Sequence, residues 1–412
     1  MSAGEGCRPL SRQKISDSER NWRARARSVL LTPEPNRHGY PEEAPWFFTR
    51  GSGQRLYTAG GAYLDLLMAR GTSVLGYNHP DVTSAVLAHA SSGFLTSLRH
   101  HAETEVAELI VEHVPSAEKV MFAKNGSDAC TFAVRAARAA TGRATIMSSG
   151  FHGFGDVFNS GPYAGNGFPA TPQPYFVPFD VNDVEAFGTK VSAAADDLAA
   201  IVIDPMNRDL ATPEFLRLAR AAAFETGAVL VFDEVVTGFR VHLGGAQALT
   251  GVTPDLTCLG KVMGNGYPLS ALVGRAEIVA ALTRTSFTST FQTDSLAMVV
   301  AGACLRRIIA DDVPARLSAL GERMRRLFDD AAAAAKVPAR AIGTPSRLEL
   351  LFSETASTSR GTAERVFQDA LAAAGVVPTL AVYVSAALTE EDFAQAGKAF
   401  SDGMAAVADA GR

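Results

Sequence analysis

A regular alternation of apolar and amphipathic segments constrains the fold of this chain more than any other feature. Between residues 120 and 274, short apolar runs such as AVLVF (residues 228–232) are separated by longer segments with helical spacing. The apolar runs lack the polar alternation of half-exposed strands, so we expect each to be covered on both faces. Helices on both faces of such strands predict an α/β fold with a mostly parallel central sheet.

The C-terminal third has a different pattern. One long helical segment covers residues 316–336, and two apolar strands and two further helices follow it. This pattern predicts a smaller α+β domain, built together with N-terminal segments that include a hairpin around Gly60 and Gly61. We therefore expect three parts: an N-terminal arm with part of the small domain, a large domain, and a C-terminal small domain, covering residues 1–80, 81–305 and 306–412.

Composition excludes several classes of protein. The 412 residues carry a net charge of -5 without a basic stripe, so we expect no nucleic-acid partner. No apolar run approaches the ~18 residues of a membrane helix, and the N-terminus lacks the apolar core of a signal peptide. The four cysteines lack metal-ligand spacing, so we expect no metal site and a cytoplasmic location; they are Cys7, Cys130, Cys258 and Cys304.

Two residues at successive strand ends carry candidate chemistry. Asp233 directly follows the run AVLVF, and Lys261 follows the run LTCLG, where a glycine-rich stretch begins. Ligands bind at the carboxyl ends of strands in parallel sheets. A carboxylate there requires a cationic or hydrogen-bonding partner, and a desolvated lysine is the usual Schiff-base nucleophile. A helix cap or a structural salt bridge remains the alternative for Asp233.

Two other motifs suit a phosphate and an aromatic ring. In AKNGSDA a strand runs into a helix, and the free amides of Gly126 and Ser127, with the serine hydroxyl, would bind an anion. In SGFHGFGD, Phe151 stands among glycines and offers a flat face, although most such residues pack in a core. A phosphate cradle, an aromatic face, a carboxylate and a lysine together are what pyridoxal 5'-phosphate (PLP) requires.

The motifs also occur in the order of a known family. LGYNHPDV, NGSDA, FHG, FDEVVTGFR, PDLTCLGK, GNGYP and STFQTDSLAM cover about the middle half of the chain. This part resembles the class III, fold type I PLP-dependent aminotransferases, and in particular their glutamate-1-semialdehyde aminomutase-like branch. The resemblance implies that the large domain binds PLP.

The resemblance assigns a role to each motif residue. Lys261 would form the Schiff base, and Asp233 would face the pyridinium nitrogen. Val235 and Phe151 would lie on the two ring faces, while Gly126 and Ser127 would bind the phosphate. Thr290 would reach the cofactor of a neighbouring subunit, which implies a homodimer. In the N-terminal arm, Arg37 stands where the aminomutase branch binds a substrate carboxylate, but a solvated arm residue is the alternative.

The implied activity is transfer of an amino group from an amino donor to a keto or aldehyde acceptor. The substrate-carboxylate features of the family are eroded, so an amino-sugar or natural-product intermediate is the acceptor we favour. Two alternatives stay open at this point. One is an aminomutase or an amino acid racemase that uses the same cofactor, and the other is a catalytically inactive scaffold.

Overall fold

The structure is a computed structural model that describes residues 16–31, 40–158, 175–206, 210–285 and 289–411. These residues fall into two compact units. The first contains the residues up to Arg70, residues 76–78 and the residues from Ala319 onward. The second contains residues 71–75 and residues 79–318.

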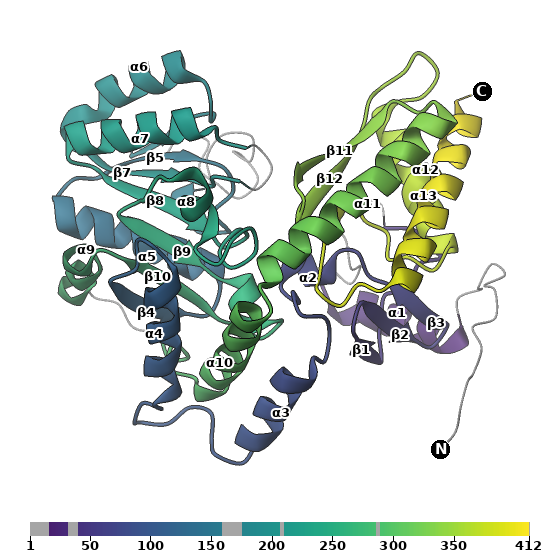
Figure 1. Cartoon of the computed structure of the whole chain (residues 1–412), viewed down its shortest axis with the longest axis horizontal. Coiled ribbons are helices and arrows are strands. Elements are labelled where there is room, and N and C mark those ends of the chain that lie inside the picture. Colours follow the sequence, from purple (N-terminus) through teal and green to yellow (C-terminus); the bar gives the residue numbers. More distant parts are fainter. Residues whose placement is uncertain (1–15, 32–39, 159–174, 207–209, 286–288, 412) are drawn as a thin grey trace. The chain divides into compact units, whose positions relative to one another are not determined.

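The second unit is built on one seven-stranded sheet (Figure 1). Five neighbouring strands of this sheet are parallel, as the apolar runs predicted. Strand β10 differs, because it is antiparallel to both of its neighbours. Only residues 260–269 separate it from the preceding strand, which is too short for the crossover that a parallel pair needs. The order across the sheet is β4 (Lys119–Ala123), β10 (Ser270–Gly274), β9 (Leu256–Leu259), β8 (Val229–Glu234), β7 (Leu198–Ile203), β5 (Thr145–Ser149) and β6 (Phe176–Pro178).

Helices cover both faces of the central strands. Alternate residues of β8, such as Val231 and Phe232, belong to two separate apolar clusters. One cluster includes α5 (Gly126–Thr141) and the other includes α7 (Pro213–Thr226). The remaining helices of this unit are α3 (Pro80–His89), α4 (Ala102–His113), α6 (Val184–Ala194), α8 (Gly245–Thr250), α9 (Ala276–Ala280) and α10 (Ser295–Ala310).

The first unit contains two antiparallel three-stranded sheets. The N-terminal sheet is β1 (Arg50–Ser52), β2 (Arg55–Thr58) and β3 (Gly61–Leu64), and the C-terminal sheet is β11 (Ala339–Thr344), β12 (Arg347–Phe352) and β13 (Ala381–Tyr383). Its helices include α1 (Asp17–Val29), most of α11 (Val313–Ala335), α12 (Arg360–Ala373) and α13 (Glu390–Ala410). Four phenylalanines form its aromatic core: Phe328, Phe352, Phe367 and Phe400.

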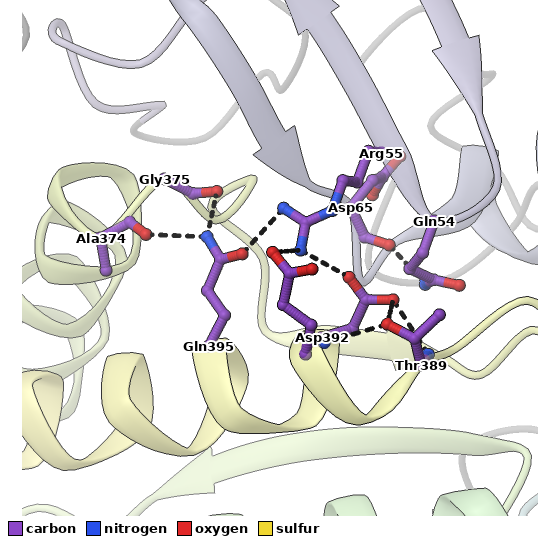
Figure 2. Close-up of polar contacts among 9 residues, drawn as sticks. Gln54, Arg55, Asp65, Ala374, Gly375, Thr389, Asp392 and Gln395 are labelled. Carbon is purple, nitrogen blue, oxygen red and sulfur yellow. Dashed lines mark hydrogen bonds and ion pairs between the residues drawn. The ribbon is translucent and has the colours of Figure 1, made fainter. Parts of the chain in front are cut away.

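Segments from the two halves of the sequence are bonded together in this first unit. The backbone of Leu64 in β3 bonds Gly375 and Val377 at 2.9 and 2.8 Å. Figure 2 shows the side-chain part of this junction, where the Arg55 guanidinium contacts Asp392 of α13 at 2.8 Å. The small α+β domain is thus built from both ends of the chain, as the sequence predicted.

A strained turn lies at the boundary of the two units. Met68, Ala69 and Arg70 all have positive φ angles, of 47°, 50° and 58°. Left-handed backbone is unfavourable for residues with a Cβ, and three in succession are rare. Asp65 braces the start of the turn, because one of its oxygens accepts the backbone N–H groups of Leu67 at 2.7 Å and Met68 at 3.1 Å.

Candidate active site

The acidic pair at the end of β8 points in two directions. Successive residues of a strand face opposite sides of a sheet, so Asp233 and Glu234 have different surroundings. Glu234 is fully buried and accepts hydrogen bonds from Thr237 Oγ1 at 2.8 Å and from the amide and side chain of Gln247, each at 3.1 Å. It therefore anchors α8 and the chain that precedes it, while Asp233 lines a cavity on the α5 side of the sheet.

Among the described residues, three groups bond the Asp233 carboxylate. Its Oδ2 atom lies 2.8 Å from Nδ1 of His152 and accepts a bond from the Cys130 thiol at 3.3 Å. Its Oδ1 atom accepts the Val235 amide at 3.1 Å. A carboxylate can accept about four hydrogen bonds, so one position remains for a ligand.

The hydrogen bonds of His152 define its charge. One ring nitrogen faces the Asp233 carboxylate, and the other lies 3.0 Å from the carbonyl oxygen of Ser149. Both partners are acceptors, so both ring nitrogens carry a proton and the ring is an imidazolium. Burial works to lower the pKa of His152, but the bonds and charges of Asp233 and Cys130 outweigh it and raise this pKa to about 10.

The same pair keeps Asp233 ionised. Burial alone would raise the pKa of this carboxyl group, because the charged form loses its hydration. The hydrogen bond and the positive charge of His152 outweigh burial, and the pKa of Asp233 is lowered from its ordinary value. The nearby charge of Lys261 acts in the same direction. Asp233 is thus a fixed negative charge at the base of the cavity.

An anion cradle lies at the start of α5. The side chain of Asn125 caps the amide of Asp128 at 3.0 Å, and Asp128 reaches back to the Asn125 amide at 3.1 Å. The amides of Gly126 and Ser127 donate to none of the described residues. They are free to bind an anion at a helix N-terminus. The Ser127 hydroxyl accepts the Phe154 amide at 3.1 Å, so its own proton is available to a ligand.

Close packing fixes the cradle against the strand end. A Cβ atom on Gly126 would lie 2.8 Å from Cγ1 of Val235, a separation that real Cβ atoms do not show. Glycine at this position therefore lets α5 begin directly beside Val235. Phe151, after β5, is 70% exposed, so its ring is available to a ligand rather than packed in a core.

Lys261 follows β9 in a strained conformation. Its φ angle of 38° is left-handed, which is unfavourable for a residue with a side chain. The side chain is half-buried. No hydrogen bond or ion pair joins its ammonium to another residue in the described part of the chain. This nitrogen is therefore available to a ligand.

These residues line one cavity of about 370 Å³ in the second unit. The cavity is large enough for a cofactor and a small substrate. Six residues predicted from the sequence lie in its lining: Gly126, Ser127, Phe151, Asp233, Val235 and Lys261. Lys124, His152, Thr72, Tyr267 and Leu269 also line it and were not predicted.

Two other predicted residues are not in this lining. Thr290 is exposed in the segment that precedes α10. Arg37 lies outside the described residues. His152, which stands in the FHG motif, and Cys130 were not predicted as site residues. Their common partner, Asp233, is distant in sequence, so no local pattern indicated the contact.

The cavity fits PLP by its chemistry. The cradle offers two free amides and a hydroxyl to a phosphate, Asp233 has a position left for a protonated ring nitrogen, and Lys261 has a free amine. Cys130, His152 and Asp233 also place one ligand atom each within 4.8 Å of one another, a spacing that a metal ion could span. His152 and Cys130 both bond Oδ2 of Asp233 in the structure, so hydrogen bonds account for this spacing without a metal ion.

Comparison with known proteins agrees with this chemistry. The sequence model of the class-III aminotransferase family matches residues 39–403, and the chain belongs to this family. An omega-transaminase from Sphaerobacter thermophilus is 28% identical, with a TM-score of 0.85 over 95% of this chain and 98% of that one. The FumI protein of Sphingopyxis sp. MTA144, in its PLP internal aldimine form, is 28% identical, with a TM-score of 0.88 over 95% and 97% of the two chains.

The protein is therefore a PLP-dependent aminotransferase, and the predicted family, fold and cofactor are confirmed. A glutamate-1-semialdehyde aminomutase from Pseudomonas aeruginosa PAO1 has a TM-score of 0.84 over 95% of both chains. It is only 18% identical, which shows a shared fold alone, so the aminomutase-like branch remains a prediction.

Among the described residues, no helix has the length and apolar character needed to cross a membrane.

Proposed function

We propose that Lys261 bonds the cofactor and moves the proton during amino transfer. The observation that carries this proposal is that its unpaired amine shares one cavity with the ionised Asp233. A free amine beside a reacting carbon can act as nucleophile and then as general acid and base. When PLP is bound, its ring supplies an electron-accepting system that stabilises negative charge on the substrate carbon.

Asp233 and His152 would hold the far side of the cofactor ring. The carboxylate keeps one hydrogen-bonding position, which suits a protonated ring nitrogen. His152 would keep Asp233 ionised and oriented, because its second ring nitrogen is fixed on the Ser149 carbonyl. In this proposal the pair maintains the electron-accepting state of the ring.

The remaining predicted residues would hold the rest of the cofactor. Gly126 and Ser127 would bind the phosphate, since their amides are free, and Val235 and Phe151 would contact the two ring faces. The exposure of Thr290 is consistent with a role across a homodimer interface. We propose this homodimer on the resemblance to the family.

The positively charged side chains that line the cavity indicate which kind of acceptor it can bind. The described residues that line the cavity include no arginine. Of their cations, Lys124 and His152 are bonded to carboxylates, and Lys261 is assigned to the cofactor. A keto or aldehyde acceptor without a carboxylate, such as an amino-sugar or natural-product intermediate, suits such a lining. Arg37 remains the proposed residue for an amino donor that has a carboxylate.

The described cysteines support a cytoplasmic location. Cys130, Cys258 and Cys304 are all buried and free. Free thiols are typical of proteins in a reducing compartment. We propose the cytoplasm on this basis.

Replacing Lys261 with alanine tests whether this residue bonds the cofactor. We expect loss of turnover and of the near-visible absorbance band of the bound cofactor. A retained band would remove Lys261 from this role. A panel of amino donors, followed by conversion of PLP to its amine form, would then identify the donor. Many turnovers on an amino acid without any keto acceptor would instead indicate an aminomutase or racemase.

A further inference from the structure

A second lysine in the cavity is held by an ion pair that the proposed mechanism does not use. Nζ of Lys124 lies 2.9 Å from Oδ2 of Asp294 and 3.3 Å from the carbonyl oxygen of Pro268. The two charged side chains are only 16% and 22% exposed. An ion pair this far from solvent is weakly screened and holds its geometry better than a surface pair.

The three bonded residues come from three segments around the cavity. Lys124 precedes the anion cradle, Gly126 and Ser127, by two residues. Pro268 lies in the loop that follows Lys261 and also lines the cavity. Asp294 caps α10, because its Oδ1 atom accepts the amide of Leu296 at 3.0 Å. A single ammonium therefore ties the cradle, the lysine loop and the start of α10 together.

We propose that Lys124 is a positioning residue, which sets the affinity for the phosphate end of the cofactor through its bonds to Asp294 and Pro268. This inference rests on the proposed function, in which the cradle binds the phosphate. Lys124 acts here through the cradle rather than as a phosphate ligand. Two of its three N–H donors are already engaged, and Asp294 compensates its charge.

Two possible roles of Lys124, as a positioning residue or as a direct phosphate ligand, predict opposite effects of Asp294→Asn on PLP binding. If Asp294 orients Lys124 and thereby the cradle, removal of its charge loosens the cradle and weakens phosphate binding. If Lys124 binds the phosphate itself, Asp294 competes with the phosphate, and removal of its charge strengthens binding. Asparagine is as good a helix cap as aspartate, so α10 keeps its N-terminus in this variant.

The test compares PLP with pyridoxal, which lacks the phosphate, in absorbance titrations of the apoprotein. We expect K124M and D294N to weaken PLP binding about tenfold, which corresponds to about 1.4 kcal/mol. Pyridoxal binding should not change, and K124R should retain most of the PLP affinity. The matched control is K398M, which removes an exposed pair between Lys398 and Asp402 of α13 and should change neither affinity.

Three results would overturn the inference. The first is unchanged or tighter PLP binding by D294N. The second is an equal loss of PLP and pyridoxal affinity in K124M, which would show that the pair supports the whole site rather than its phosphate end. The third is K124M binding PLP like the wild type. Failure of the proposed function is distinguishable, because K261A would then retain the near-visible band with PLP.

Discussion

Nδ1 of His152 lies 2.8 Å from Oδ2 of Asp233, and both side chains are buried. The ring is fixed on its other side by the Ser149 carbonyl. A buried charged pair with both members hydrogen-bonded is stable in this position, whereas either charge alone would be costly. The charge of Asp233, the proposed partner of the cofactor ring nitrogen, therefore depends on a histidine from a different strand end.

Replacing His152 with glutamine (H152Q) should impair catalysis without removing the cofactor site. Loss of a hydrogen bond between charged groups is worth about 1.5–3 kcal/mol, so we expect kcat/KM to fall about tenfold to hundredfold. The near-visible band should also titrate at a different pH, because Asp233 loses its cationic partner. H101Q is the matched control, since His101 makes an equally short contact with Glu105, at 2.8 Å, but in solvent. Equal kinetics for H152Q and the wild type would contradict this role.

The same pair should make the stability of the apoprotein depend on pH. The pKa of His152 is raised from 6.5 to about 10, so the folded protein holds a proton that the unfolded chain releases. This contribution to stability is complete below about pH 6.5 and is lost as the pH rises through about 10. Thermal unfolding from pH 6 to 10.5 measures it. The difference in midpoint between wild type and H152Q should shrink across this range, and a constant difference would argue against the charged pair.

Replacing Gly126 with alanine should strain the contact with Val235. The new Cβ atom would lie 2.8 Å from Cγ1 of Val235, and overpacking of this kind costs about 1–3 kcal/mol. We expect a lower melting temperature and weaker PLP binding. Shortening Val235 to alanine should restore part of both losses in the G126A background. Strictly additive effects in this double-mutant cycle would show that the contact is not the cause.

Replacing Ala69 with glycine should stabilise the protein. Its φ angle is 50°, and left-handed backbone costs a residue with a Cβ roughly 1–2 kcal/mol. Ala69 is exposed, so little packing is lost, and we expect a gain of about 1 kcal/mol in the free energy of unfolding. Met68 provides the contrast, because it has a similar φ of 47° but a buried side chain. M68G should lower the free energy of unfolding. Denaturant unfolding of A69G and M68G measures both effects.

Elements with local signals could be predicted from the sequence. Helix α7 begins at Pro213 and ends before Gly227, and proline and glycine are typical of these two ends of a helix. The β2–β3 hairpin turns at Ala59 and Gly60, directly before Gly61, around the glycine pair where it was expected. The cavity residues could also be predicted where motif and strand end coincide, as at Asp233 and Lys261. Both kinds of prediction depend on residues that are close together in the chain.

Features that depend on distant partners could not be predicted in this way. Lys124 and Asp294 are 170 residues apart, and His152 and Asp233 are 81 residues apart. The antiparallel direction of β10 is a different case, because the apolar pattern is the same for either direction and only the short segment 260–269 before it indicates antiparallel pairing. Apart from Thr237, the partners of Glu234 lie in α8, 12 and 13 residues later, so no local pattern marked Glu234 as the anchor of that helix.

The junction between β2, β3 and the C-terminal segments has a consequence for biosynthesis. The partners of Arg55 and Leu64, namely Asp392, Gly375 and Val377, leave the ribosome more than 300 residues later. The β2–β3 hairpin therefore cannot form its final contacts until translation is nearly complete. The seven-stranded sheet, whose strands end at Gly274, can form during this delay. In a nascent chain stalled before residue 375, the segment that forms the seven-stranded sheet should therefore resist protease, and the N-terminal hairpin should be cleaved.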